Sequence, residues 1–172
     1  MDSALTYQAY YTKSDPILNY MTGMLNFEPH DNILEPCGGD GVFIDKILEN
    51  NPDAHVNVFE LNPSAVVGLK EKYSNKHSIS VKETDTLLDS TIVSCSQKYD
   101  KIIGNPPYGA RNDEKKKDLL NKLYSDLYTK ESYTLFLYAC TRCLKEKRRT
   151  FVLLYQIHFY LSIDICLLES FC

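Results

Sequence analysis

The sequence predicts a parallel α/β protein, and three observations support this fold class. Short apolar segments alternate with segments whose apolar residues repeat at helical spacing. A glycine-rich turn follows the first apolar segment. Acidic or amide side chains follow successive segments, as ligand-binding residues do at the carboxyl ends of parallel strands. We therefore expect a sheet with helices on both faces and strands near residues 31–35, 55–60, 78–82, 100–104 and 150–155.

The first predicted strand and the turn after it form a candidate ligand site. The turn, residues 37–41, reads G-G-x-G after its cysteine and lacks the dinucleotide fingerprint G-x-G-x-x-G. A helix is expected over residues 42–49. Glu35, at the strand end, is poorly suited to a pyrophosphate and fits a cationic amino acid group better. The candidate ligand-binding residues here are Glu35, Pro36, Cys37, Gly38, Gly39 and Gly41.

Two later strand ends supply further candidates. The second strand ends in Glu60, and a carboxylate at this place typically accepts both hydroxyls of a ribose. The third strand is followed by Asp85 and Thr86, which are placed to meet the amino group of an adenine. A single acid of this kind is more often a solvated strand end, but their order along the chain favours ligand binding. The candidates are Glu60, Leu61, Asp85 and Thr86, and Asn105 at the end of the fourth strand is a further candidate for binding the same ligand.

The fourth strand ends in Asn105-Pro106-Pro107-Tyr108, which suits a planar ring that bears an amine. The amide oxygen of Asn105 can accept a hydrogen bond from an exocyclic NH2. Pro106 has no N–H, and Pro107 favours an extended backbone before it, so the Pro106 carbonyl can be a second acceptor. The ring of Tyr108 offers a stacking face.

These two acceptors suggest a reaction. The lone pair of a conjugated amine is delocalised, and two in-plane acceptors draw the N–H bonds toward a tetrahedral arrangement. The lone pair then becomes available to attack an electrophilic methyl group. No strong base is needed, because the proton leaves only after the nitrogen has become cationic. The competing interpretation is a proline-rich turn that merely closes a strand.

Taken together, these motifs resemble an S-adenosylmethionine-dependent N6-adenine DNA methyltransferase of the restriction-modification kind. Residues 10–17 (YYTKSDPI) resemble the family's N-terminal donor motif, and 34–41 (LEPCGGDG) resemble its D-P-A-x-G-x-G turn, with Glu and Cys as departures. Glu60, Asp85 and the Asn105–Tyr108 tetrapeptide match in order and spacing, and Phe136 resembles the family's donor-packing aromatic. The resemblance covers roughly residues 7–149.

The resemblance implies fold, cofactor and partner. The fold would be the Rossmann-like fold of S-adenosylmethionine-dependent methyltransferases, with S-adenosyl-L-methionine as cofactor. Tyr11 and Thr12 would cover the methionine end of the donor, and Phe136 would pack against its adenine. The partner would be DNA, whose target adenine must flip out of the duplex, with Tyr108 replacing part of the lost stacking.

Composition indicates one domain over residues 1–172, without a target-recognition domain. We expect a cytoplasmic protein, because no signal peptide and no apolar run of about 20 residues is visible. Cys140-x-x-Cys143 has no partner pair at zinc spacing, so no metal and free thiols are expected. The net charge of −4 predicts weak DNA binding by this chain alone, with residues 111–130 as the main basic segment. That segment also has helical apolar spacing, so its lysines could equally form a solvated face.

The C-terminal sequence departs from the family pattern. After residue 150 the family continues in the style of V-F-I-I-P-D-S-F-L, whereas this chain has FVLLYQIHFY. Codon degeneracy permits P-D-S-F-L in a frame two nucleotides later, and we hypothesise that residues after about 148 are out of frame. The last strands of the sheet would then be missing, with exposed apolar surface and self-association as consequences.

Three interpretations remain. The first is a DNA adenine methyltransferase or its catalytic fragment. The second is a methyltransferase for another planar amine: guanine N2 or adenine in RNA, or a glutamine of a release factor. The third is an inactive donor-binding fragment. Recognition sequence and partner subunits are not predicted.

Overall fold

The computed structural model describes residues 12–107, 114–127, 131–146 and 150–153. Two of the predicted site residues, Tyr11 and Tyr108, lie outside this part of the chain, as does nearly all of the segment that the frameshift hypothesis concerns.

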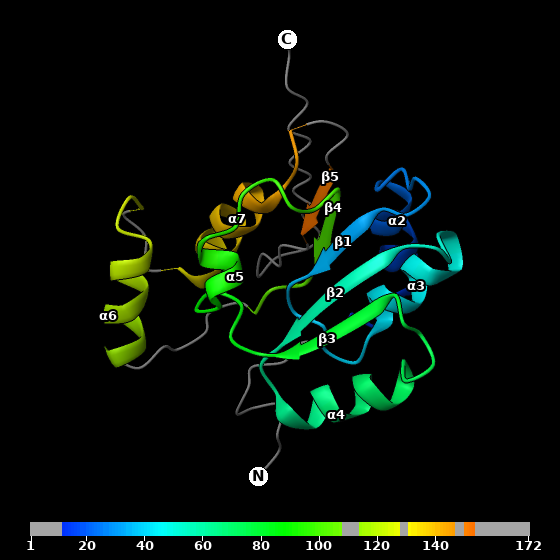
Figure 1. Cartoon of the computed structure of the whole chain (residues 1–172), viewed down its shortest axis with the longest axis horizontal. Coiled ribbons are helices and arrows are strands. Elements are labelled where there is room, and N and C mark those ends of the chain that lie inside the picture. Colours follow the sequence, from blue (N-terminus) through cyan, green and yellow to red (C-terminus); the bar gives the residue numbers. More distant parts are fainter. Residues whose placement is uncertain (1–11, 108–113, 128–130, 147–149, 154–172) are drawn as a thin grey trace.

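A five-stranded parallel sheet forms the centre of the structure (Figure 1). Its strands follow the spatial order β3-β2-β1-β4-β5, and each neighbouring pair is parallel. The strands are β1 (Asn32–Glu35), β2 (His55–Glu60), β3 (Ile79–Glu83), β4 (Lys101–Gly104) and β5 (Thr150–Leu153). The five predicted strands are confirmed, with boundaries shifted by one or two residues.

Helices cover both faces of the sheet, as predicted. The helices α2 (Asp15–Gly23), α3 (Val42–Asn50) and α4 (Pro63–Lys72) lie on one face, and their apolar residues share a core with Ile33, Val56 and Ile103. The helices α5 (Ser90–Val93), α6 (Glu114–Leu123) and α7 (Ser132–Cys143) lie on the other face, around Leu34 and Ile102. Successive strand residues point to opposite faces, so one strand contributes to both cores.

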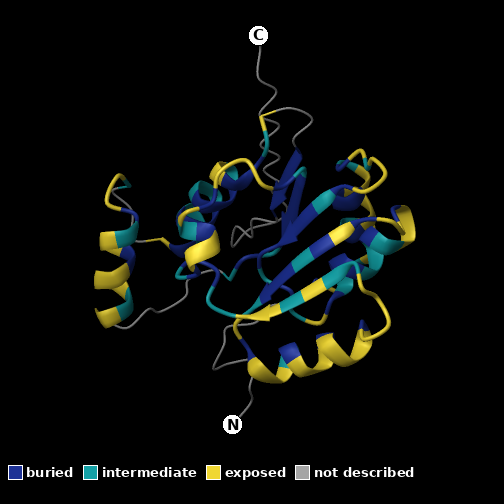
Figure 2. Cartoon of the chain, in the orientation of Figure 1, coloured by how far each residue is buried: buried dark blue, intermediate teal, exposed yellow. Residues whose placement is uncertain are grey.

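Burial follows this layering (Figure 2). Every residue of β4 is buried, and only the first residue of β1 is not, which explains their short, mainly apolar sequences. The strand β3 lies at one edge of the order, and three of its five residues are exposed. Cys140 and Cys143 lie on one face of α7, as expected, and both side chains are buried against the sheet.

Local sequence signals explain where several helices begin. Asn62 caps α4, where its side chain accepts a hydrogen bond from the Ser64 amide at 3.1 Å, and Pro63 occupies the first turn. Asp89 caps α5 through the Thr91 amide at 2.9 Å. The helix α3 begins after Gly41, whose φ of 85° is the left-handed region that favours glycine. The turns that lead into these helices therefore lie at the carboxyl edge of the sheet.

Candidate active site

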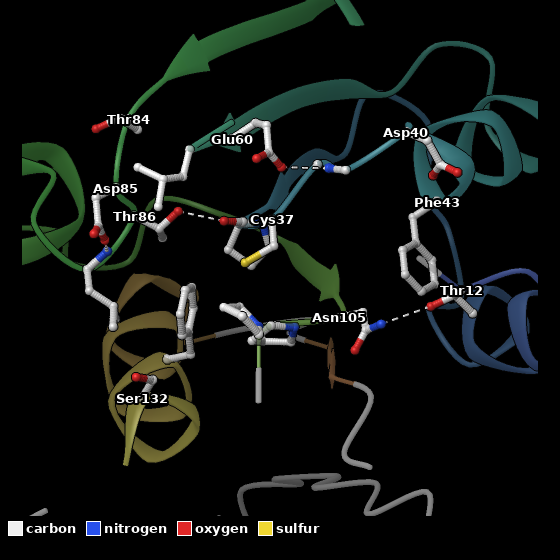
Figure 3. Close-up of a pocket in the computed structure, with 18 of the residues that line it drawn as sticks. Thr12, Cys37, Asp40, Phe43, Glu60, Thr84, Asp85, Thr86, Asn105 and Ser132 are labelled. Atoms are coloured by element: carbon white, nitrogen blue, oxygen red, sulfur yellow. Dashed lines mark hydrogen bonds between the residues drawn. The ribbon is translucent and has the colours of Figure 1, made fainter. Parts of the chain in front are cut away.

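A cavity opens at the carboxyl ends of β1, β2 and β4 and beside the turn after β3 (Figure 3). Its volume is about 890 Å³ including the space open to solvent. Residues from all the described motifs line it: Thr12, Pro36, Cys37, Gly38, Gly39, Glu60, Leu61, Asp85, Thr86, Asn105, Pro106, Pro107 and Phe136. The motifs that the sequence analysis selected therefore meet in one place.

Two predicted residues lie near the cavity without lining it. Glu35 is fully buried beneath the turn after β1. Gly41 lies on the far side of that turn, where a Cβ would come within 2.7 Å of the Tyr73 hydroxyl. Glu35 and Gly41 therefore support the conformation of the turn. A direct contact of either residue with a ligand stays a prediction.

Seven lining residues were not selected from the sequence: Asp40, Val42, Phe43, Thr84, Leu87, Lys116 and Ser132. Five of them lie within two positions of a predicted residue, so extending each motif by one or two positions would have found them. Lys116 and Ser132 belong to α6 and α7, and only the packing of these helices brings them to the cavity.

The glycine turn is held against β2. The Gly38 amide donates to the Phe59 carbonyl at 2.9 Å, and a Cβ on Gly38 would collide with the Val58 side chain. On the other side of the turn, the Tyr73 hydroxyl lies 2.9 Å from the Gly41 carbonyl and 2.7 Å from Asp45. Burial, followed by the bond to Asp45, raises the pKa of Tyr73, so its hydroxyl stays a donor.

Glu60 is oriented by backbone groups. Its Oε2 accepts a hydrogen bond from the Gly39 amide at 2.8 Å (Figure 3), and its Oε1 accepts from the Asn62 amide at 2.6 Å. Each carboxylate oxygen has a second lone pair, which leaves acceptor capacity toward the cavity. Glu60 is thus a preorganised acceptor at the place predicted for a ribose.

Glu35 has a different environment at the end of β1. Burial raises the pKa of Glu35 to about 8, and the nearby charge of Glu60 adds to the rise, whereas the hydrogen bond from the Cys37 amide at 3.0 Å opposes it. Its Oε2 has no hydrogen-bond partner among the described residues. Gly104 makes room for this carboxyl, because a Cβ there would lie 2.7 Å from Oε1.

The turn after β3 is tied to the turn after β1. The Thr86 hydroxyl donates to the Pro36 carbonyl at 2.5 Å, and Asp85 Oδ1 accepts from the Leu87 amide at 3.1 Å. Asp85 Oδ2 faces a basic residue, Lys116, at 2.5 Å. The acid predicted to meet an adenine amine thus already forms an ion pair.

Asn105 follows β4 directly, and its side chain is oriented from a distant part of the chain. Its Nδ2 donates to the Thr12 hydroxyl at 3.2 Å, across 93 positions of sequence (Figure 3). Its Oδ1 is buried and points away from Thr12. Pro106 and Pro107 line the cavity beside it, and Phe136 of α7 is 5% exposed at the same wall.

The sheet order and the position of the cavity define the class of protein. They match the Rossmann-like fold of S-adenosylmethionine-dependent methyltransferases. An S-adenosylmethionine-dependent O-methyltransferase from Thermotoga maritima has a TM-score of 0.56 at 12% identity, covering 88% of this chain and 48% of that chain. Coclaurine N-methyltransferase bound to N-methylheliamine and S-adenosylhomocysteine has a TM-score of 0.54 at 15% identity, covering 83% and 38%. The predicted fold class is confirmed.

The chain belongs to the Eco57I restriction-modification methylase family, whose profile matches residues 41–160. Type II methyltransferase M.AccI from Acinetobacter calcoaceticus is 29% identical over 122 residues, which are 68% of this chain and 22% of the relative. Modification methylase CviBIII from Paramecium bursaria Chlorella virus NC1A is 34% identical over 120 residues, or 69% and 29%. The predicted resemblance to restriction-modification methyltransferases is confirmed.

Methyltransferases whose names give other targets are also similar to this chain. Ribosomal RNA small subunit methyltransferase A from Prochlorococcus marinus is 26% identical over 99 residues, which are 58% of this chain and 34% of the relative. Release factor glutamine methyltransferase from Streptococcus pneumoniae is 31% identical over 102 residues, or 59% and 34%. The chain spans about a third or less of the length of these curated relatives. By family and fold, the chain is related to S-adenosylmethionine-dependent methyltransferases, in agreement with the predicted cofactor.

No cluster of three or more metal-ligating side chains occurs in the part of the chain that the structure describes. The four cysteines in the same part, Cys37, Cys95, Cys140 and Cys143, are free thiols. Among the helices of these described ranges, none has the length and apolar content needed to cross a bilayer.

Proposed function

We propose that this chain carries the catalytic domain of an adenine-N6 DNA methyltransferase of the restriction-modification kind. The observation that carries the proposal is the convergence of Asn105, Pro106 and the acids Glu60 and Asp85 on one cavity. The residues proposed to bind the target amine and the acids proposed to bind a nucleoside thereby share a single space. This arrangement suits transfer between a nucleoside-bearing donor and a planar amine.

The cavity fits S-adenosylmethionine, which supplies an electrophilic methyl group when bound. Glu60 would accept the ribose hydroxyls, and Asp85 would accept the adenine amine. Gly38 keeps the turn after β1 close to β2, so that backbone rather than a side chain borders the site. Phe136 offers an apolar wall for the base. Glu35, whose buried Oε2 has no partner in the described residues, lies beneath the turn that would border the amino acid end of the donor.

Asn105 would orient and activate the target amine. Because its Nδ2 donates to Thr12, its Oδ1 is the end of the amide that can accept an N–H of the target. The Pro106 carbonyl would accept the other N–H. Together they raise the electron density available on nitrogen, and the proton leaves to water after the nitrogen has gained its fourth bond. Tyr108, the next residue, would stack on the flipped base.

DNA is the proposed partner, and α6 is the basic element nearest to the cavity. It carries Lys115, Lys116, Lys117 and Lys122 beside the acids Glu114 and Asp118. This modest excess of positive charge, within a chain of net charge −4, predicts weak and salt-sensitive DNA binding.

A second candidate function is methylation of an RNA base or of a release-factor glutamine. Relatives whose names give those two functions are 26% and 31% identical to this chain. An exocyclic base amine and a glutamine side-chain amide are both conjugated, planar nitrogen groups, so the Asn105–Pro106 acceptors suit either. The larger coverage of the chain by M.AccI and CviBIII favours DNA.

The test is methyl transfer from labelled S-adenosylmethionine to three substrates offered side by side: duplex DNA, ribosomal RNA and a release factor. We expect label in DNA alone, and none with Asn105→Ala, while both proteins bind S-adenosylhomocysteine in calorimetry. Label in RNA or in the release factor instead would overturn the DNA assignment. Donor binding by a folded chain without transfer to any substrate would support the inactive-fragment interpretation.

A further inference from the structure

An ion pair lies inside the cavity at the position proposed for the donor's adenine. Lys116 Nζ of α6 is 2.5 Å from Asp85 Oδ2, and the two side chains are 26% and 16% exposed. Lys116 is the one lysine or arginine among the described residues that line the cavity. The sequence places it in the basic segment of residues 111–130 and gives it no role in the donor site.

The helical face that carries Lys116 explains why it points inward. Lys116, Leu120 and Tyr124 are spaced four residues apart and therefore share one face of the helical segment. Leu120 is buried in the core. The Tyr124 hydroxyl donates to the Leu87 carbonyl at 2.8 Å, which ties this segment to the turn that carries Asp85. Lys116 is thus held beside Asp85 by the packing of its own helix.

The two carboxylate oxygens of Asp85 have different partners. Oδ1 accepts the Leu87 amide at 3.1 Å and helps to fix the turn, whereas Oδ2 pairs with Lys116. The Lys116 ammonium is a charged donor and holds the position at Oδ2 that faces the cavity. A neutral adenine amine that approaches Asp85 from the cavity would therefore have to move this ammonium aside.

We propose that Lys116 is a further residue of the donor site and lowers donor affinity by holding Asp85 Oδ2 until the adenine amine displaces it. This inference rests on the proposed function, because it assumes that Asp85 receives the adenine. Displacement costs the ion pair, and a partly exposed pair contributes about two- to fivefold in an equilibrium constant. Removing the ammonium should therefore tighten donor binding by that factor.

Salt dependence separates competition from a merely structural role. S-adenosylhomocysteine carries no net charge at neutral pH, so its own attraction to the protein depends little on ionic strength. Salt weakens a partly exposed ion pair. The affinity of the native chain for S-adenosylhomocysteine should therefore rise with salt, and it should rise less without Lys116.

The experiment is calorimetric titration with S-adenosylhomocysteine at low and high potassium chloride. Lys116→Met keeps the aliphatic stem and removes the charge, and Lys116→Arg keeps a cation at Asp85. The matched control is Lys117→Met, because Lys117 pairs with Glu114 at 2.6 Å on the same helix and does not line the cavity. We expect about two- to fivefold tighter binding and a smaller salt effect for Lys116→Met alone.

Unchanged or weaker binding by Lys116→Met would overturn the inference and leave the proposed function standing, since it would mean that Lys116 is neutral or contacts the donor. An equal gain in affinity for S-adenosylhomocysteine in Lys117→Met would also overturn it, because the gain would then follow from the loss of any positive charge on this helix. Failure of every folded variant, the native chain included, to bind S-adenosylhomocysteine would overturn the proposed donor site and this inference with it.

Discussion

The two halves of the cavity are organised differently. At the ends of β1, β2 and β3, acids are fixed by backbone amides close in sequence or on the neighbouring turn, as in Glu60 with Gly39 and Asn62. At the end of β4, Asn105 donates to the hydroxyl of Thr12, which belongs to the distant N-terminal segment. The first half is therefore shaped by the sheet itself, whereas the second includes a long-range side-chain contact. We expect changes in the first half to alter donor binding and changes in the second to alter transfer.

The largest effect is expected in the β4 half. Asn105→Ala removes the amide oxygen that would accept from the target amine as charge develops on nitrogen. We expect transfer at saturating donor to fall by about 10²–10³-fold, as for other preorganised hydrogen-bonding groups at a reacting centre. Calorimetry on the same protein should give a nearly native affinity for S-adenosylhomocysteine. A loss of transfer explained entirely by weaker donor binding would contradict the division between the halves.

The second-largest effect is expected at Glu60, and it is a loss of donor affinity. Glu60→Ala removes a charged acceptor from the ribose position and from the Gly39 and Asn62 amides, and we expect S-adenosylhomocysteine to bind about 100-fold more weakly. Glu83→Ala is the matched control, because Glu83 is an exposed acid at the end of β3 that does not line the cavity. Equal affinities of the two variants would remove Glu60 from the donor site.

Glu35 gives a pH-dependent test of the β1 end. Its folded pKa of about 8 lies above the ordinary value of 4.5, so the folded chain holds the proton more tightly than the unfolded chain. The stability linked to this group is therefore fully present below about pH 4.5 and is lost as the pH rises to about 8. The slope is at most about 1.4 kcal/mol per pH unit.

Glu35→Gln keeps the shape of the side chain and removes the titration. Urea unfolding between pH 5 and pH 8, a window inside the interval bounded by the pKa values 4.5 and about 8, should show the native chain losing stability relative to the variant. Parallel stability curves for the two proteins would mean that Glu35 is ionised in the folded state.

The smallest effect is expected at Thr12. Thr12→Val removes the acceptor that Thr12 offers to Asn105 Nδ2, so the amide is held less firmly in the orientation that presents Oδ1 to the target. One neutral hydrogen bond contributes about 0.5–1.5 kcal/mol, so transfer should fall about fivefold at an unchanged donor affinity. Thr12→Ser restores a hydroxyl and should restore the rate. A loss of donor affinity with a native transfer rate would instead make Thr12 a donor contact only.

The difference between the halves also explains what the sequence could predict. Glu60, Asp85 and Asn105 each follow their own strand, so a local pattern was enough to select them, and the strand order then brings them together. The neutral, buried character of Glu35 was not predictable, because it depends on the space left by Gly104 on a neighbouring strand. The position of Lys116 in the cavity could not be predicted for another reason. A lysine-rich helix is usually a solvated face, and only the packing of Leu120 and the bond from Tyr124 turn that lysine inward.

The most direct test of the central claim is the identity of the methylated nucleoside. Duplex DNA treated with the native chain and S-adenosylmethionine would be digested to nucleosides and separated by mass spectrometry. The account predicts N6-methyldeoxyadenosine, and its absence from DNA treated with Asn105→Ala. Methylation of cytosine, or N6-methyldeoxyadenosine at an undiminished level with Asn105→Ala, would contradict it.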